Sequence, residues 1–125
     1  MSRILIIEDN DKNMKLVCDI LQHHGHQVLE AVTGLDGVRQ ALAQRPDLVL
    51  MDIQLPDIDG IEALRRIRAD AALDRTPVLA VSASVMPDEQ QLIVASGFDA
   101  YVTKPISLKP FVATVQRFLQ LGRRA

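Results

Sequence analysis

Four short apolar runs in the sequence are each followed at once by a residue that carries charge or donates a hydrogen bond. In chain order these residues are Glu8-Asp9, Asp52, Ser82 and Lys104. If the four runs are parallel strands, their carboxyl ends meet at one edge of a sheet and the side chains converge there. Acids, a hydroxyl and an ammonium in one place can hold a divalent cation and a phosphoryl group.

The three acids at these ends predict a metal site. Carboxylates held close together repel one another, so at least one pKa is raised unless a cation lies between them. Hard oxygen ligands select Mg²⁺, Mn²⁺ or Ca²⁺, and a site with few carboxylates suits Mg²⁺, which keeps several waters. We therefore expect Mg²⁺, with Mn²⁺ as the alternative, near Glu8, Asp9 and Asp52.

Lys104 and Ser82 extend this site toward phosphate chemistry. A lysine is a compact cation for one phosphoryl oxygen, and a hydroxyl can donate to another. The carboxylate of Asp52 can act as the nucleophile toward phosphorus. Taken singly, each residue has a simpler interpretation as a solvated surface charge, so the hypothesis depends on the strand ends meeting in one topology.

Strands and helices alternate along the chain. The strand-like runs are continuous apolar stretches, as in strands buried on both faces, and lie near 3–8, 27–32, 47–52, 77–82 and 99–103. Segments with helical periodicity separate them, at 10–24, 35–44, 60–69, 87–96 and 107–121. This alternation predicts an α/β fold, a doubly wound five-stranded parallel sheet in the order 2-1-3-4-5 with helices on both faces.

Composition limits the class of protein. The 125 residues, 48% hydrophobic and 24% charged, fit one domain covering 1–125. A net charge of −2 with dispersed basic residues argues against nucleic-acid binding, and no apolar stretch is long enough to cross a membrane. A single cysteine, Cys18, and no leader-like N-terminus indicate a cytoplasmic protein. Cys18 shares a helical face with apolar residues, which predicts a buried thiol rather than a reactive one.

Two further clusters have open interpretations. Leu92, Ile93 and Val94 point about 100° apart on a helix, so they cannot all enter one core. We expect Leu92 or Val94 to be exposed on a partner or dimer surface; the alternative is a frayed or unusually deep helix. The histidines of the run 23–26 lie at a helix end, where imidazoles can meet free carbonyls, and their spacing suits no ordinary zinc site.

With the motifs around them, these residues resemble the receiver domain of two-component response regulators, a flavodoxin-like fold. The resemblance covers the whole chain, through the segments ILIIEDNDKNMKL, DLVLMDIQLPDIDGIEALRRIR, PVLAVSAS and GFDAYVTKPI. Within the family the chain is most similar to single-domain receivers of the DivK type, followed by receivers of hybrid histidine kinases. The resemblance implies that Asp52 accepts phosphate from a histidine kinase or a histidine phosphotransferase.

The family pattern also implies roles for the surrounding residues. Asp9 and Asp52 would bind Mg²⁺ directly, Glu8 largely through water, and the backbone carbonyl of Gln54 would add a ligand. Lys104 would pair with the phosphate, and the Lys104-Pro105 bond is expected to be cis.

Other positions would read out or tune the phosphorylated state. Ser82 occupies the hydroxyl switch position and Tyr101 the aromatic switch position, while Gln54 and Ser84 are positions that tune the phosphate lifetime. Movement of Ser82 and Tyr101 would couple the site to the face built from the fourth helix, the fifth strand and the fifth helix.

The resemblance therefore predicts a signalling switch rather than a metabolic enzyme, catalysing only its own phosphorylation and dephosphorylation. Its output would be contact with a downstream protein through Leu92, Val94 and Tyr101, as a monomer or weak dimer. Lys12 and Lys15 are candidates for kinase docking; ordinary solvated helix surface is the competing interpretation.

Three rival classes share parts of the pattern. A phosphatase acting on metabolites would need a second acid and a cap that excludes water, for which the chain has no spare residues. A scaffold that works without phosphorylation would not need the intact acceptor, acids and lysine. A flavin binder of the same fold would not place Glu8, Asp9 and Asn10 after its first strand, because acids repel a phosphate without a metal.

Overall fold

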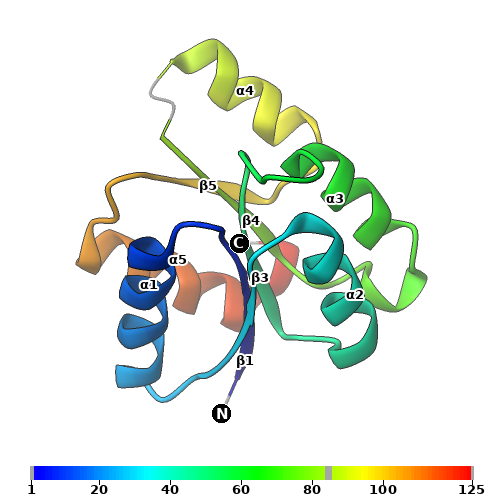
Figure 1. The fold of residues 1–125 in the computed structure, drawn as a ribbon. Coiled ribbons are helices and arrows are strands. Elements are labelled where there is room, and N and C mark those ends of the chain that lie inside the picture. The colour runs from blue at the N-terminus through cyan, green and yellow to red at the C-terminus, as the bar shows by residue number, and fades with distance from the viewer. Residues whose placement is uncertain (1, 84–85, 125) are drawn as a thin grey trace.

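A computed structural model of the chain describes residues 2–83 and 86–124 and shows one parallel sheet between two layers of helices (Figure 1). Within these residues the strands are β1 (Arg3–Ile7), β2 (Gln27–Ala31), β3 (Leu48–Asp52), β4 (Val78–Ser82) and β5 (Ala100–Thr103). The helices are α1 (Asp11–His23), α2 (Gly34–Gln44), α3 (Gly60–Arg68), α4 (Pro87–Ala95) and α5 (Leu108–Leu121). Two short 3₁₀ helices, η1 (Ala71–Leu73) and η2 (Gly122–Arg124), were not predicted.

The strand order is β2-β1-β3-β4-β5, so the predicted fold class and topology are confirmed. Each predicted strand and α-helix has both its ends within one residue of the observed bounds. The register pairs Ile7 with Met51, Asp52 with Val81, and Ser82 with Thr103. Because these pairs lie at the carboxyl ends of their strands, the residues singled out for their chemistry lie at the same end of the sheet.

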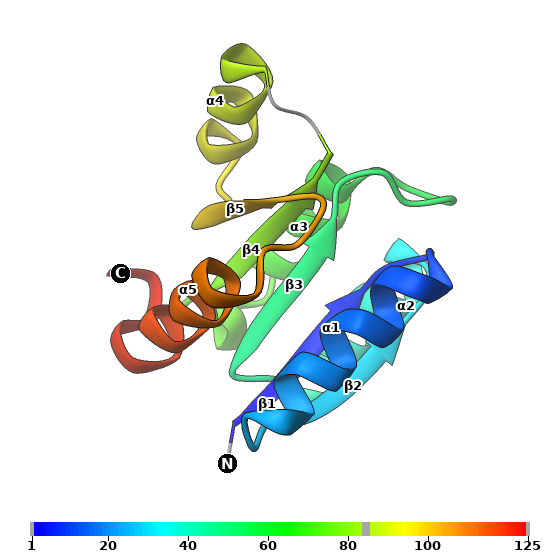
Figure 2. The same ribbon diagram turned by 90° about the vertical axis from the view of Figure 1, so that its left-hand side faces the viewer.

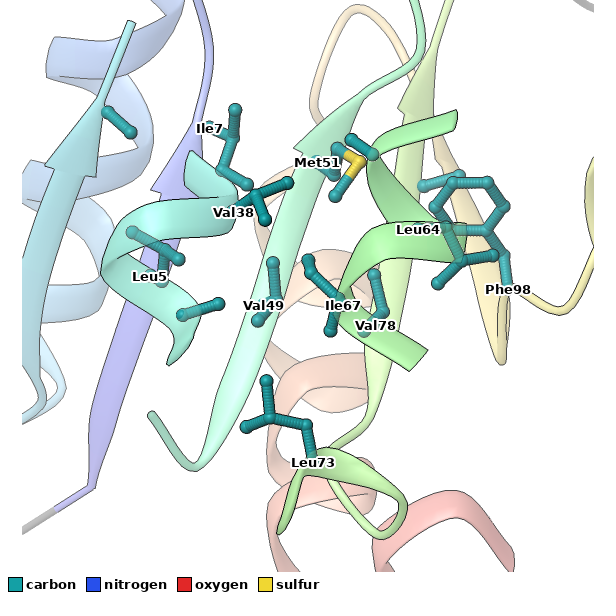
Figure 3. Close-up of a cluster of buried hydrophobic side chains, with 14 of the residues drawn as sticks. Leu5, Ile7, Val38, Val49, Met51, Leu64, Ile67, Leu73, Val78 and Phe98 are labelled. Carbon is teal, nitrogen blue, oxygen red and sulfur yellow. The ribbon is translucent and has the colours of Figure 1, made fainter. Parts of the chain in front are cut away.

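Alternate residues of each strand enter two different cores, one on each face of the sheet. Helices α1 and α5 cover one face of the sheet (Figure 2). On that face, Ile4 and Ile6 of β1 belong to the same core as Phe111 and Phe118. Helices α2, α3 and α4 cover the other face, and Figure 3 shows its core of strand residues against side chains such as Leu64. Burial on both faces explains why the strands are continuously apolar in sequence.

Helix starts fix the loops at the carboxyl end of the sheet. Asn10 caps α1 by accepting from the backbone N–H of Asn13 at 3.0 Å. Thr33 caps α2 through the N–H of Asp36, and Asp59 caps α3 through the N–H of Glu62. Such caps satisfy donors that the helix itself leaves free. The loops that follow β1, β2 and β3 therefore end at defined positions.

Helix α4 is the least embedded of the helices. Ile93 is 5% exposed and faces the core, whereas Leu92 is 61% exposed and Val94 is 45% exposed. The prediction that the three apolar residues divide between core and solvent is confirmed. No helix in the described part of the chain is long and apolar enough to cross a membrane.

The cysteine and one of the histidines, His24, behave as predicted. Cys18 is buried, and burial with the neighbouring Glu30 raises the pKa of its thiol to about 11, far from that of a reactive thiolate. His24 Nδ1 lies 2.9 Å from the carbonyl oxygen of Ile20 at the end of α1.

Candidate functional site

Three carboxylates meet at the carboxyl ends of β1 and β3. Glu8 and Asp52 are buried, at 4% and 6% exposure, and Asp9 is exposed. One oxygen from each carboxylate lies within 4.8 Å of the other two, and no other group of three acids, histidines or cysteines in residues 2–83 and 86–124 is as close. Oxygen donors at this spacing suit a hard divalent cation such as Mg²⁺.

Lys104, directly after β5, closes the site from the far side of β4. Its Nζ lies 2.9 Å from Glu8 Oε1 and 3.1 Å from Asp52 Oδ2. The backbone N–H of Lys104 donates to the carbonyl of Ser82 at 2.9 Å, and the Lys104-Pro105 bond is cis, as predicted. One ammonium offsets one of three carboxylates, so the site keeps an excess of negative charge.

The electrostatics of the site follow from this excess. Burial and the neighbouring Asp52 raise the pKa of Glu8, although Lys104 acts against the shift. Burial alone would lower the pKa of Lys104, but its bonds to Glu8 and Asp52 outweigh burial and raise it. The expectation that crowded acids raise at least one pKa is confirmed.

Backbone groups fix the orientation of the two buried acids. The N–H of Gln54 donates to Asp52 Oδ1 at 3.0 Å, and the N–H of Asn10 donates to Glu8 Oε2 at 3.2 Å. The N–H of Glu8 itself donates to the carbonyl of Ala31 at the end of β2, at 2.9 Å. Each buried carboxylate therefore has one oxygen on Lys104 and the other on a backbone amide.

The residues expected to respond to phosphate lie on β4 and β5. Ser82 follows Val81, the residue paired with Asp52, and is half-buried. Tyr101 is also half-buried, and its hydroxyl donates to Gln90 Oε1 of α4 at 2.6 Å. A groove of about 500 Å³ between α4 and Tyr101 is lined by Pro87, Gln90, Gln91, Val94, Ala95 and Tyr101. The remaining tuning position, Ser84, lies outside the described residues.

Two charged groups escaped prediction from the sequence. Asp57, in the loop after β3, accepts hydrogen bonds from the first two amides of α2. Asp99, just before β5, binds Arg68 and Arg123 at the amino ends of the strands. The sequence does show an acid, Asp99, directly before a strand and an arginine, Arg68, in the last turn of a helix. Neither position indicates which residue the side chain binds.

The fold and the site together define a class: a doubly wound α/β protein with an acidic cluster and a lysine at the switch point of its sheet. The model of the response regulator receiver domain matches residues 4–116. The chain belongs to this family and is a response regulator of two-component signalling.

Curated relatives have nearly the same length as this chain. The polar-differentiation response regulator DivK of Brucella anthropi is 39% identical over 116 residues, which are 93% of this chain and 94% of the relative. DivK of Brucella ovis is 38% identical over the same shares. The chain is thus a DivK-like receiver that aligns with single-domain relatives almost from end to end.

Solved structures agree with the fold. The chemotaxis response regulator CheY4 of Vibrio cholerae superposes with a TM-score of 0.88 at 26% identity, over 94% of this chain and 98% of that one. The receiver domain of a Pseudomonas aeruginosa sensor histidine kinase superposes with a TM-score of 0.84 at 33% identity, over 99% and 98% of the two chains. That crystal structure has a magnesium ion coordinated in its active-site cleft.

Proposed function

We propose that residues 1–125 form one receiver domain that takes a phosphoryl group onto Asp52 from a phosphohistidine partner, with Mg²⁺ or, as the alternative, Mn²⁺. The observation that carries the proposal is the convergence of Glu8, Asp9 and Asp52 within 4.8 Å, with Lys104 Nζ 3.1 Å from Asp52. An anionic site with one fixed lysine lacks positive charge, and a cation with a phosphoryl group completes it.

The transfer is a substitution at phosphorus. A carboxylate oxygen of Asp52 forms the new O–P bond while the N–P bond of the phosphohistidine breaks, and the imidazole nitrogen leaves with the electron pair and is then protonated. The Gln54 N–H holds Asp52 Oδ1 in place, at 3.0 Å. Lys104 already contacts Asp52 and provides a cation for a phosphoryl oxygen, and the hydroxyl of Ser82 donates to another.

Asp9 and Asp52 would hold the Mg²⁺ directly, with the Gln54 carbonyl as a backbone ligand and Glu8 acting largely through water. When bound, the cation supplies charge neutralisation for the phosphoryl oxygens. The related receiver domain with magnesium in its cleft supports this assignment.

The output is contact with a downstream protein. Leu92 and Val94 are exposed on α4, where Val94 lines the groove together with Tyr101, and they form the proposed partner surface. Ser82 moving toward the phosphoryl group would free space for Tyr101 to leave Gln90. The protein acts in the cytoplasm as a monomer or weak dimer, with a histidine kinase or phosphotransferase upstream and no metabolic substrate of its own.

The test is phosphate uptake by the Asp52→Asn variant. Wild type incubated with acetyl phosphate and Mg²⁺ should show a shifted band on a phosphate-affinity gel, and the variant should show none. Asp19→Asn is the matched control, because Asp19 is an exposed acid of α1 that pairs with Lys15. Chelation of Mg²⁺ should remove the shifted band from wild type and from Asp19→Asn. Equal labelling of wild type and Asp52→Asn would refute the assignment.

A further inference from the structure

The loop between β3 and α3, residues 53–59, starts one residue after Asp52 and carries Gln54. Its base is closed by the N–H of Gly60, which donates to the carbonyl of Ile53 at 3.0 Å. A side chain at Gly60 would be crowded by the backbone, since a Cβ there would lie 3.0 Å from Ile53 Cα and 3.1 Å from the carbonyl oxygen of Asp52. The base of the loop is thus held against the phosphoacceptor strand.

The far side of the loop is held by Asp57. Asp57 Oδ1 accepts the N–H of Gly34 and Oδ2 accepts the N–H of Leu35, both at 2.8 Å. These are the first amides of α2, more than twenty residues away in sequence, and Thr33 already serves as the cap of that helix. A carboxylate at the amino terminus of a helix is also favoured by the helix dipole.

Close packing accompanies these hydrogen bonds. A Cβ on Gly34 would lie 2.6 Å from Ile58 Cγ1 and 3.2 Å from Asp57 Oδ1. A side chain at residue 34 would force Ile58 to shift, so the glycine allows the loop to pack this closely against the start of α2. The contact is therefore a packed junction rather than a single surface hydrogen bond.

The start of α2 also belongs to the other half of the site. Ala31, at the end of β2, accepts the N–H of Glu8 at 2.9 Å, and α2 begins at Gly34. Asp57 therefore joins the segment that supports Glu8 to the loop whose Gln54 N–H supports Asp52. The segments that support the two buried acids are thus connected by hydrogen bonds through Asp57, in addition to the direct pairing of β1 with β3.

We propose that Asp57 is a positioning residue of the site: its carboxylate locks the 53–59 loop onto α2 and so fixes Gln54 and Asp52 for the cation. This inference rests on the proposed function, because it assigns a role within the same site. Asp57 does not touch the cation or the phosphoryl group; it acts through Gln54.

The experiment compares Asp57→Ala with wild type by isothermal titration with Mg²⁺ and by amide hydrogen exchange. Removing a residue that orients metal ligands typically costs about tenfold or more in affinity, so we expect the Mg²⁺ dissociation constant to rise about tenfold. Phosphate uptake from acetyl phosphate should slow at low Mg²⁺ and recover at saturating Mg²⁺. The Gln54 amide should exchange faster in the variant.

Asp59→Ala is the matched control. Asp59 lies in the same loop and also caps a helix, accepting the N–H of Glu62 at 2.8 Å, but it does not connect the loop to α2. Both variants should lower the urea midpoint of unfolding, whereas only Asp57→Ala should weaken Mg²⁺ binding. Asp57→Asn keeps one acceptor oxygen and should have an intermediate affinity, which tests the proposal even if Asp57→Ala does not fold.

We expect the Mg²⁺ affinity of Asp57→Ala to fall about tenfold, as for other residues that orient metal ligands. A fall of less than about threefold would overturn the proposal, and Asp57 would then only bind the first amides of α2. An equal loss of affinity in Asp59→Ala would overturn it as well. If wild type takes no phosphate, the proposed function fails, and the Mg²⁺ affinities of the variants still decide the role of Asp57.

Discussion

A cluster of charged residues lies at each end of the strands in this sheet. At the carboxyl ends, Glu8, Asp9 and Asp52 lie together, and Lys104 pairs with Glu8 and Asp52. At the amino ends of β4 and β5, Arg68 and Arg123 surround Asp99; we call this group the Arg68–Asp99 cluster. The first group has an excess of negative charge, and the second has an excess of positive charge with its acid fully engaged.

The Arg68–Asp99 cluster has the properties of a structural element. Asp99 Oδ2 accepts from the N–H of Val78 at 2.8 Å and from Arg68 Nη2 at 3.1 Å, and Oδ1 accepts from Arg123 Nε at 2.8 Å. Arg68 Nη1 also donates to the carbonyls of Leu73 and Thr76. These bonds connect α3, η1 and the start of β4 with the chain end after α5, so the cluster stabilises the fold.

The carboxyl-end cluster leaves its charge uncompensated. Lys104 binds two of the three acids, Asp9 remains exposed, and the pKa of Glu8 is raised by burial and by Asp52. A folded protein tolerates such a group at a cost in stability when the group serves a function. The comparison teaches that acids left without a counter-ion, rather than burial of charge as such, distinguish the carboxyl end of this sheet from the Arg68–Asp99 cluster, whose acid is fully paired.

The largest expected effect on the free energy of unfolding comes from replacing one aspartate by asparagine in each of the two clusters. Asp99→Asn should lose about 2–3 kcal/mol of unfolding free energy, because Arg68 would be left without a counter-ion and an amide would face a guanidinium. Asp52→Asn should change it by less than about 1 kcal/mol, since relief of repulsion among the acids offsets the weakened bond to Lys104. Urea unfolding in a metal chelator measures both.

Asp99→Asn should still take phosphate in its folded fraction, whereas Asp52→Asn should not. Equal losses of stability in the two variants would break the distinction between the clusters.

A smaller effect is expected from Mg²⁺ on the wild type. At a concentration ten times the dissociation constant, a ligand that binds only the folded state adds about 1.4 kcal/mol, or roughly 5 °C in Tm for a domain of this size. Differential scanning calorimetry with and without MgCl₂ at constant ionic strength measures the shift. Asp99→Asn should keep it, and Glu8→Gln and Asp9→Asn should reduce it. An undiminished shift in both acid variants would place the cation elsewhere.

The smallest effect concerns pH in the absence of metal. The folded-state pKa of Glu8 lies above its ordinary value of 4.5, so folding favours its protonated form. Its contribution to stability is therefore present below pH 4.5 and is lost as the pH rises through the raised pKa. The difference in unfolding free energy between wild type and Glu8→Gln, followed by urea titration upward from pH 4.5, should show this loss. A difference that does not vary with pH would contradict the raised pKa.

Most of the fold could be predicted from the sequence because its signals are local. Continuous apolar runs such as Leu48–Asp52, set between helical periodicity and Gly or Pro, define strands and helices, and the rules for parallel sheets then limit the topology. The same rules place Glu8, Asp52 and Lys104 together. Helical geometry also predicted that Leu92, Ile93 and Val94 cannot all enter one core, although it left open whether Leu92 or Val94 is exposed.

The missed features are long-range pairings. Asp57 lies between Pro56 and the helix cap Asp59, and nothing in that spacing indicates that it binds the amides of a helix more than twenty residues earlier. Arg68 and Asp99 are separated by 31 residues, and their pairing depends on how η1 and the end of the chain pack. The roles of Ser82, of the Gln54 carbonyl and of the surface around Tyr101 remain predictions.

The central claim is that Asp52 is the phosphoacceptor, and the most direct test identifies the modified residue chemically. Wild type treated with acetyl phosphate and Mg²⁺ would be reduced with borohydride, which converts an aspartyl phosphate to homoserine, and then mapped by peptide mass spectrometry. The account predicts homoserine at position 52 and at no other acid of the site. Modification at Glu8 or Asp9, or a phosphorylated protein without homoserine at position 52, would contradict it.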